Sequence, residues 1–237
     1  MCSICTFFEG FTFQIFAIGF LGTAVAILLG FRNNSAYERF WEARKAWGDL
    51  TNASRYFSSQ VMTYVQPPQG QDQEAPNVAD VHQKILFRHL AFVNALRLQL
   101  LSDTCWDELK PWLSDDEFQR LEKAVNKATQ LNHLQAQHFR DLHEAGWITS
   151  QWYVVGLMET LKETYRCQGI SERIKNTPLL RQYSFFTQHF VWLFVLLLPL
   201  GLVQHLGWQM IPVYIALATV FTTTERIGSR PLARLCQ

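Results

Sequence analysis

Uncharged apolar residues are concentrated in three stretches near the two ends of the chain. Residues 11–31, 185–203 and 207–224 contain no Asp, Glu, Lys or Arg. The hydrocarbon core of a bilayer is about 30 Å thick, and a helix of about 20 apolar residues crosses it. The pattern therefore predicts three transmembrane helices. Three buried core helices of a soluble protein are the weaker alternative, because buried helices seldom remain uncharged for so long.

Basic residues beside these stretches predict how the chain is oriented. They follow the first stretch, precede the second and follow the third, whereas the link at residues 204–207 has none. Cytoplasmic loops of membrane proteins carry an excess of Lys and Arg. We therefore expect residues 32–182 and the C-terminus in the cytoplasm and the 204–207 link outside. No basic segment precedes the first stretch, which is also long for a signal-peptide core, so we expect it to be retained.

The middle of the chain carries apolar residues at helical spacing. One stripe continues from the first membrane stretch and comprises Ala36, Phe40, Ala43, Trp47, Leu50, Phe57, Val61 and Tyr64. Residues 66–77, rich in Pro, Gln and Gly, predict a loop. A second helix is marked by Val78, Val81, Ile85, Phe92, Leu96 and Leu100.

Two further helices are predicted after residue 110. Ser114 and Glu117 have the spacing of a capping box, which opens a third helix expected to run through Ala128. Residues 148–165 are expected to form a fourth helix. Alternating strand patterns and hairpin turns are absent from the sequence.

The sequence therefore predicts an all-α, multi-pass membrane protein with a cytosolic helical domain. We expect a membrane helix in residues 1–31, the cytosolic domain in 32–182, two membrane helices in 183–225 and a cytosolic tail in 226–237. Composition agrees, because only 17% of the 237 residues are charged and 14% are aromatic. The net charge of +1 gives no indication of nucleic-acid binding.

Candidate metal and catalytic groups are few and ambiguous. Cys2 and Cys5 form a CxxC pair, but no second pair follows at zinc spacing. His82 and His89 share a helix face without a nearby carboxylate or Cys that would complete a site. His189 lies inside a predicted span, where an ionisable group is a functional candidate, although a hydrogen-bonded structural His is the stronger interpretation. We expect no metal and no cofactor.

Enzyme motifs are likewise missing from the sequence. A P-loop, GxGxxG, GxSxG or HExxH pattern is not found. Glu38 and Glu42 stand one helical turn apart, but basic neighbours favour a solvated, ion-paired helix face over a catalytic carboxylate pair. We therefore expect no enzyme activity and no catalytic residue.

A face of the first membrane stretch is the strongest candidate for function. Thr23, Ile27 and Phe31 are spaced by four and lie along one helix face. If several copies pack around an axis, this face forms apolar rings, and a narrow apolar constriction gates ions by dewetting. The spacing alone favours ordinary packing against lipid or another helix.

Three segments of the sequence resemble the bestrophin family, particularly its bacterial members. They are GFRNNSAYERFWEARKAWG at residues 30–48, ERIKNTPLLRQYS at residues 172–184 and LLPLGLVQHLGW at residues 197–208. The resemblance implies a homopentamer around one central pore, in the inner membrane of a bacterium. It also implies a neck lined by Thr23, Ile27 and Phe31, and a cytosolic aperture that we assign to Leu179.

The sequence departs from the family pattern at three places. The family usually has another membrane helix ahead of the pore helix, and residues 1–10 are too few for it. Thr23 occupies a neck position that is usually apolar, which makes that ring wetter. The acidic C-terminal stretch that helps to bind calcium in animal members is replaced by IGSRPLARLCQ.

The sequence therefore predicts a bestrophin-like channel for small monovalent ions, either chloride or sodium. Its expected partners are other copies of the chain, the lipid bilayer and the permeant ions. A non-conducting structural or regulatory membrane protein of the same fold is the alternative. Selectivity stays open, because Glu38 and Glu42 attract cations whereas neighbouring Arg and Lys offset them.

Overall fold

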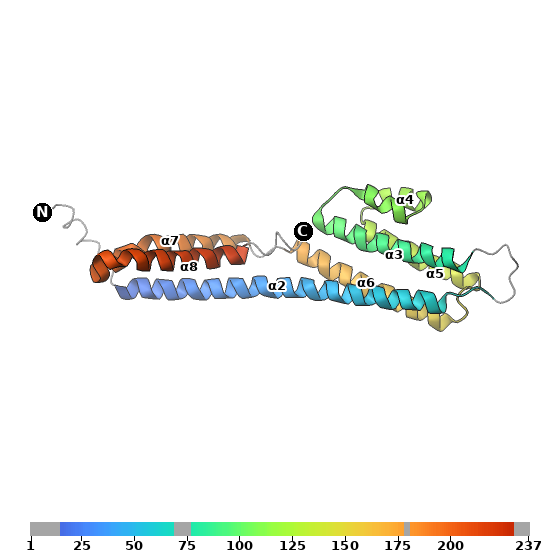
Figure 1. The fold of residues 1–237 in the computed structure, drawn as a ribbon, viewed down its shortest axis with the longest axis horizontal. Helices are drawn as coiled ribbons and strands as arrows, with labels where there is room; N and C mark the ends of the chain where they lie inside the picture. Colours follow the sequence, from blue (N-terminus) through green and yellow to red (C-terminus); the bar gives the residue numbers. More distant parts are fainter. Residues whose placement is uncertain (1–14, 69–76, 178–180, 230–237) are drawn as a thin grey trace. The chain divides into compact units, whose positions relative to one another are not determined.

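The computed structural model describes residues 15–68, 77–177 and 181–229, and every regular element in these ranges is a helix (Figure 1). The predicted all-α class is confirmed. The elements are, in chain order, α2 (Ile15–Tyr64), α3 (Val78–Leu101), η1 (Trp106–Trp112), α4 (Asp115–Glu122), α5 (Lys127–Glu144), α6 (Gln151–Asn176), α7 (Arg181–Leu206), η2 (Gly207–Gln209) and α8 (Met210–Ser229).

The helices form two compact units. The end unit contains α2 as far as Trp41 together with α7, η2 and α8, and the middle unit contains α2 from Glu42 together with α3 to α6. These backbone contacts do not locate a membrane, so the membrane boundaries at residues 31, 182 and 225 stay predictions. Helix α2 is continuous for 50 residues, as the apolar stripe after the first stretch predicts.

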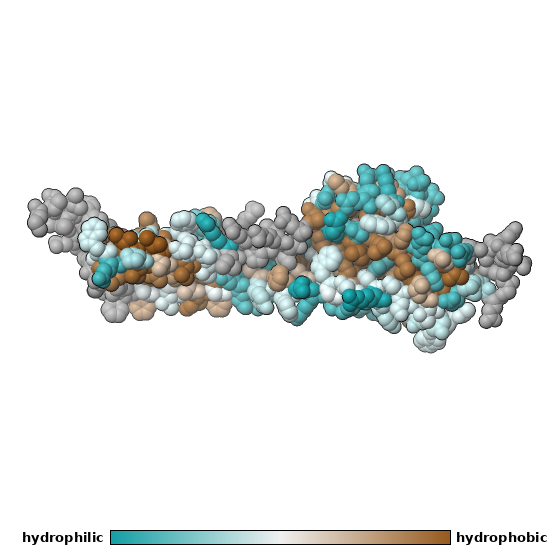
Figure 2. All heavy atoms as spheres, in the orientation of Figure 1, coloured by the Kyte–Doolittle hydropathy of each residue, from teal (hydrophilic) through white to brown (hydrophobic). Residues whose placement is uncertain are grey.

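Close helix contacts hold the end unit together. Ile18, Val25 and Leu29 of α2 are buried against Val191 and Phe194 of α7. Gly22 permits this approach, because a Cβ atom at that position would lie 2.9 Å from the Phe194 ring. Small residues at such contacts are typical of helices packed within membranes. Large apolar side chains are also exposed on α7 and α8, where Figure 2 shows hydrophobic surface.

One segment among the described residues is long and apolar enough to cross a membrane by length and composition, and it is Phe185–Val203 in α7. The predicted span at residues 11–31 begins outside the described residues and continues in α2. The predicted span at residues 207–224 covers η2 and most of α8. The number of spans therefore stays a prediction.

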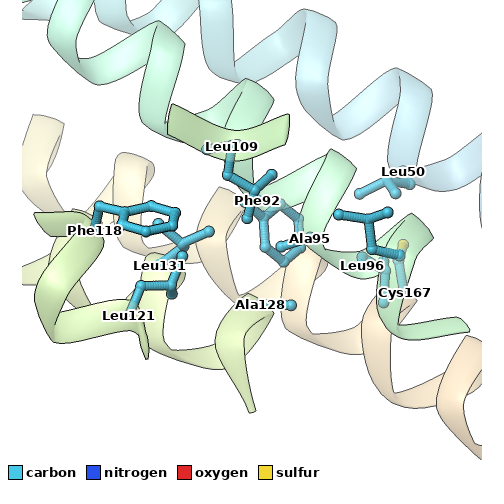
Figure 3. Close-up of a cluster of buried hydrophobic side chains, with 12 residues drawn as sticks. Leu50, Phe92, Ala95, Leu96, Leu109, Phe118, Leu121, Ala128, Leu131 and Cys167 are labelled. Carbon is cyan, nitrogen blue, oxygen red and sulfur yellow. The ribbon is translucent and has the colours of Figure 1, made fainter. Parts of the chain in front are cut away.

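The middle unit has its own hydrophobic core. Phe92, Leu96 and Leu131 are fully buried in one cluster, in which Phe92 lies beside Leu109 of η1 and Leu96 lies beside Leu50 and Cys167 (Figure 3). The predicted stripe of α3 supplies three buried core residues, Ile85, Phe92 and Leu96. Each buried side chain of this size contributes about 1.5–3 kcal/mol to folding.

Helix boundaries after residue 110 differ in part from the prediction. The capping box of Ser114 and Glu117 is confirmed at the start of α4. The helix predicted to continue through Ala128 is wrong, because α4 ends at Glu122 and Asn126 caps a new helix, α5, by accepting from the Thr129 N–H. Asn at an N-cap favours such a restart.

Three other elements differ from the sequence prediction. Helix α6 runs from Gln151 to Asn176 and is longer than the predicted 148–165 segment. Most of α5 and the whole of η1 were not predicted. The polar positions Asn132 and Gln135 interrupt the apolar stripe of α5, yet both side chains are buried.

Candidate functional site

Helix α2 has two contrasting faces within the end unit. Val25 and Leu29 are 1% and 3% exposed, because they pack against α7. Ile27 and Phe31 are 53% and 65% exposed on the other side of the helix. Thr23, predicted to share their face, is exposed as well. The three predicted neck residues therefore point away from the packing of their own chain.

The hydroxyl of Thr23 is partly satisfied within α2. It donates to the Gly19 carbonyl at 3.0 Å, one helical turn back. The hydroxyl proton is then engaged, while the oxygen keeps acceptor capacity toward water or an ion. Thr23 is thus more polar than Ile27 and Phe31, but less so than a free hydroxyl.

The same face becomes polar after Phe31. Asn34 and Glu38 follow at helical spacing and are exposed, and the Asn34 amide donates to the Glu38 carboxylate at 2.8 Å. We call Thr23, Ile27, Phe31, Asn34 and Glu38 together the exposed stripe. It changes from apolar to acidic along its length.

A buried ion pair joins α2 to α8 beside the exposed stripe. Arg32 donates to the Glu225 carboxylate at 3.0 Å, and their side chains are 1% and 14% exposed. Among the described residues, the Arg32 Nε has no hydrogen-bond partner. The sequence pattern places Arg32 only as a basic flank of the first span. Its burial depends on a carboxylate 193 residues away, which local spacing does not reveal.

Leu179, the predicted cytosolic aperture, lies outside the described residues. Its position and role stay a prediction, as do the roles of Thr23, Ile27 and Phe31. The CxxC pair of Cys2 and Cys5 also lies outside the described residues.

Each candidate histidine, like the candidate carboxylate Glu42, contacts a different group of the chain. His82 contacts the Val65 carbonyl at 2.8 Å, and His89 contacts the Ser54 hydroxyl at 2.8 Å. His189 contacts the Phe185 carbonyl of its own helix at 2.8 Å. Residues 15–68, 77–177 and 181–229 contain no group of three His, Cys, Asp or Glu suited to a metal. Glu42 pairs with Arg173, which agrees with an ion-paired helix face.

Two histidines of the middle unit are held neutral. Burial lowers the pKa of His89 from 6.5 to about 4, and its ring stacks on Phe57. Burial, helped by the nearby Arg88 and Lys84, lowers the pKa of His138 to about 4. Burial opposes ionisation of Glu117 as well, but the Arg88 guanidinium outweighs it and lowers the pKa of that carboxyl.

The neutral state of His89 makes the stability of the protein depend on pH. The unfolded chain binds a proton at His89 below about 6.5, whereas the folded chain does so only near 4, so the free energy of unfolding falls as the pH falls. We expect His89 to account for a loss of about 2 kcal/mol between pH 7.5 and pH 5. Thermal unfolding of the detergent-solubilised protein at both pH values measures this loss.

The matched variants are His89→Gln and, as control, His133→Gln on the exposed face of α5. The first should reduce the pH dependence of the unfolding temperature and leave the part due to His138. The second should leave the dependence unchanged. Equal pH dependence in all three proteins would contradict this role of His89.

Comparison with known proteins gives a consistent family. A family model described as "Bacterial/Fungal Bestrophin protein" matches residues 3–230. A voltage-dependent anion channel-forming protein of Ralstonia nicotianae is 32% identical over 211 residues, which cover 89% of this chain and 66% of that protein. The Escherichia coli protein YneE, also called a voltage-dependent anion channel-forming protein, is 28% identical and covers 84% of this chain. The chain spans 62% of the length of YneE.

Solved structures of a bacterial bestrophin homologue have a similar fold to this chain. The crystal structure of a bacterial bestrophin homologue from Klebsiella pneumoniae superposes with a TM-score of 0.85 at 25% identity, over 96% of this chain and 85% of that chain. A point mutant of that homologue gives a TM-score of 0.87 at 26% identity, over 96% of this chain and 81% of the other. The family and the membrane-protein fold are therefore both supported.

Proposed function

The chain belongs to the bacterial and fungal bestrophins, and on that premise we propose that it is a subunit of a non-enzymatic channel for small monovalent ions. Its curated relatives are named as voltage-dependent anion channel-forming proteins, which supports ion conduction. We place the channel in the inner membrane of a bacterium, crossed by several helices of each subunit.

One observation carries the proposal, namely the exposed stripe of α2. Large apolar side chains exposed in a row are covered by lipid or by another protein surface in the assembled state. Ile27 and Phe31 are more than half exposed while the opposite face of the same helix is buried. We propose that five copies of the chain surround an axis and direct this stripe toward it.

In such an assembly Ile27 and Phe31 form apolar rings, with Thr23 as the outer and wetter ring. A narrow apolar ring excludes water, and an ion that enters must lose part of its hydration shell. We further propose Leu179 as a second constriction at the cytosolic exit. No metal and no cofactor enters this mechanism.

Ion flux from liposomes tests the proposal. Purified protein reconstituted into vesicles loaded with KCl should release the salt faster than empty vesicles when the outside is diluted. Assembled protein that releases no ions over the same range of voltages and salts would contradict conduction. That result would favour the alternative, a non-conducting structural or regulatory membrane protein of the same fold.

A further inference from the structure

Glu38 stands on the exposed stripe, two helical turns beyond Phe31. Seven residues of α-helix span about 10 Å and return to nearly the same face. A neck that ends at Phe31 would therefore open onto Glu38 at its cytosolic mouth. The inference developed from this position rests on the proposed function.

The Glu38 carboxylate differs from the other acidic group of this helix segment. Glu42 forms an ion pair with Arg173, so its charge is offset within the chain. The Glu38 carboxylate accepts a hydrogen bond from the neutral Asn34 amide at 2.8 Å, which orients the carboxylate without neutralising it. Its side chain is exposed.

We propose that Glu38 determines ion selectivity at the cytosolic mouth of the neck by attracting monovalent cations. Rings of Glu or Asp favour cations in pores, whereas rings of Arg or Lys favour anions. In a homopentamer the five Glu38 carboxylates form such a ring.

The curated relatives are named as anion channel-forming proteins, whereas a ring of Glu38 carboxylates favours cations. Five carboxylates near the neck repel chloride and concentrate sodium or potassium there, over a distance set by the Debye length of about 10 Å at 0.1 M salt. This pore should therefore prefer anions less than the same pore with Glu38 neutralised. Higher salt should weaken the difference.

Reversal potentials in planar bilayers under a KCl gradient test the proposal. Glu38→Gln keeps an acceptor for the Asn34 amide and removes the charge, and Glu38→Asp keeps the charge. We expect Glu38→Gln to lower the cation-to-anion permeability ratio roughly five- to tenfold near 0.1 M salt, because close, poorly screened charges set this ratio. Glu38→Asp should stay near the wild type, and the effect of Glu38→Gln should shrink near 1 M salt.

The outcomes separate the two proposals. A wild type that conducts, together with a Glu38→Gln variant of unchanged reversal potential, overturns the role of Glu38 and leaves the channel proposal intact. An equal shift in Glu38→Asp and Glu38→Gln overturns it too, because the charge would not be the cause. A wild type that assembles but carries no current overturns both proposals.

Discussion

Replacing Ile27 with alanine should raise the current carried by each assembled channel about tenfold. That change corresponds to a barrier to ion passage lowered by about 1.4 kcal/mol. The side chain of Ile27 is 53% exposed on the face of α2 that turns away from α7. In the proposed assembly its removal widens the ring and lets water stay in the neck. An ion then crosses with more of its hydration shell. Single-channel recordings of equal amounts of assembled protein measure the effect.

Leu196 provides the matched control for this experiment. It is an apolar residue of α7 that is 70% exposed in the same unit. We expect Leu196→Ala to leave the current within about twofold of the wild type, since rings at the pore rather than exposed apolar area in general control conduction. If Ile27→Ala and Leu196→Ala changed the current to the same extent, the neck would have to be placed elsewhere.

The second large effect concerns stability. Glu225→Gln should lower the free energy of unfolding by about 3–5 kcal/mol, because it leaves the charge of a buried partner uncompensated. That partner is Arg32, which is 1% exposed and donates to Glu225 at 3.0 Å. Denaturant titration of the protein in detergent, followed by tryptophan fluorescence, measures the loss.

Two further variants distinguish a buried pair from a general loss of charge. Glu159→Gln removes an exposed carboxylate that pairs with Lys162 on the surface, and it should cost less than about 1 kcal/mol. The double variant Arg32→Met with Glu225→Leu removes both charges and should recover most of the lost stability. If Glu225→Gln and Glu159→Gln lowered the free energy of unfolding by the same amount, the pair of Arg32 and Glu225 would not stabilise the end unit.

The sequence predicted features that repeat along one helix and missed those that depend on distant partners. The stripe from Ala36 to Tyr64 predicted the continuous helix α2, because its apolar positions recur every three to four residues. The Ser114–Glu117 capping box was confirmed because both partners are local. By contrast, most of α5 could not be predicted, because the buried polar residues Asn132 and Gln135 interrupt its apolar stripe.

In the candidate site, too, local spacing could be predicted from the sequence, whereas contacts between distant residues could not. The shared face of Thr23, Ile27 and Phe31 follows from spacing by four, and the structure shows that this face is exposed. The burial of Arg32 could not be predicted, because Glu225 reaches it only after the chain returns through α7 and α8. Whether the face meets water, lipid or another copy depends on assembly, which is a property of several chains.

A cryo-electron microscopy map of the purified, detergent-solubilised protein tests the central claim most directly. It should show five copies around one axis, with the side chains of Ile27 and Phe31 directed toward that axis at the narrowest point. A monomer, or an assembly in which these side chains face the detergent belt, would contradict the channel proposed here.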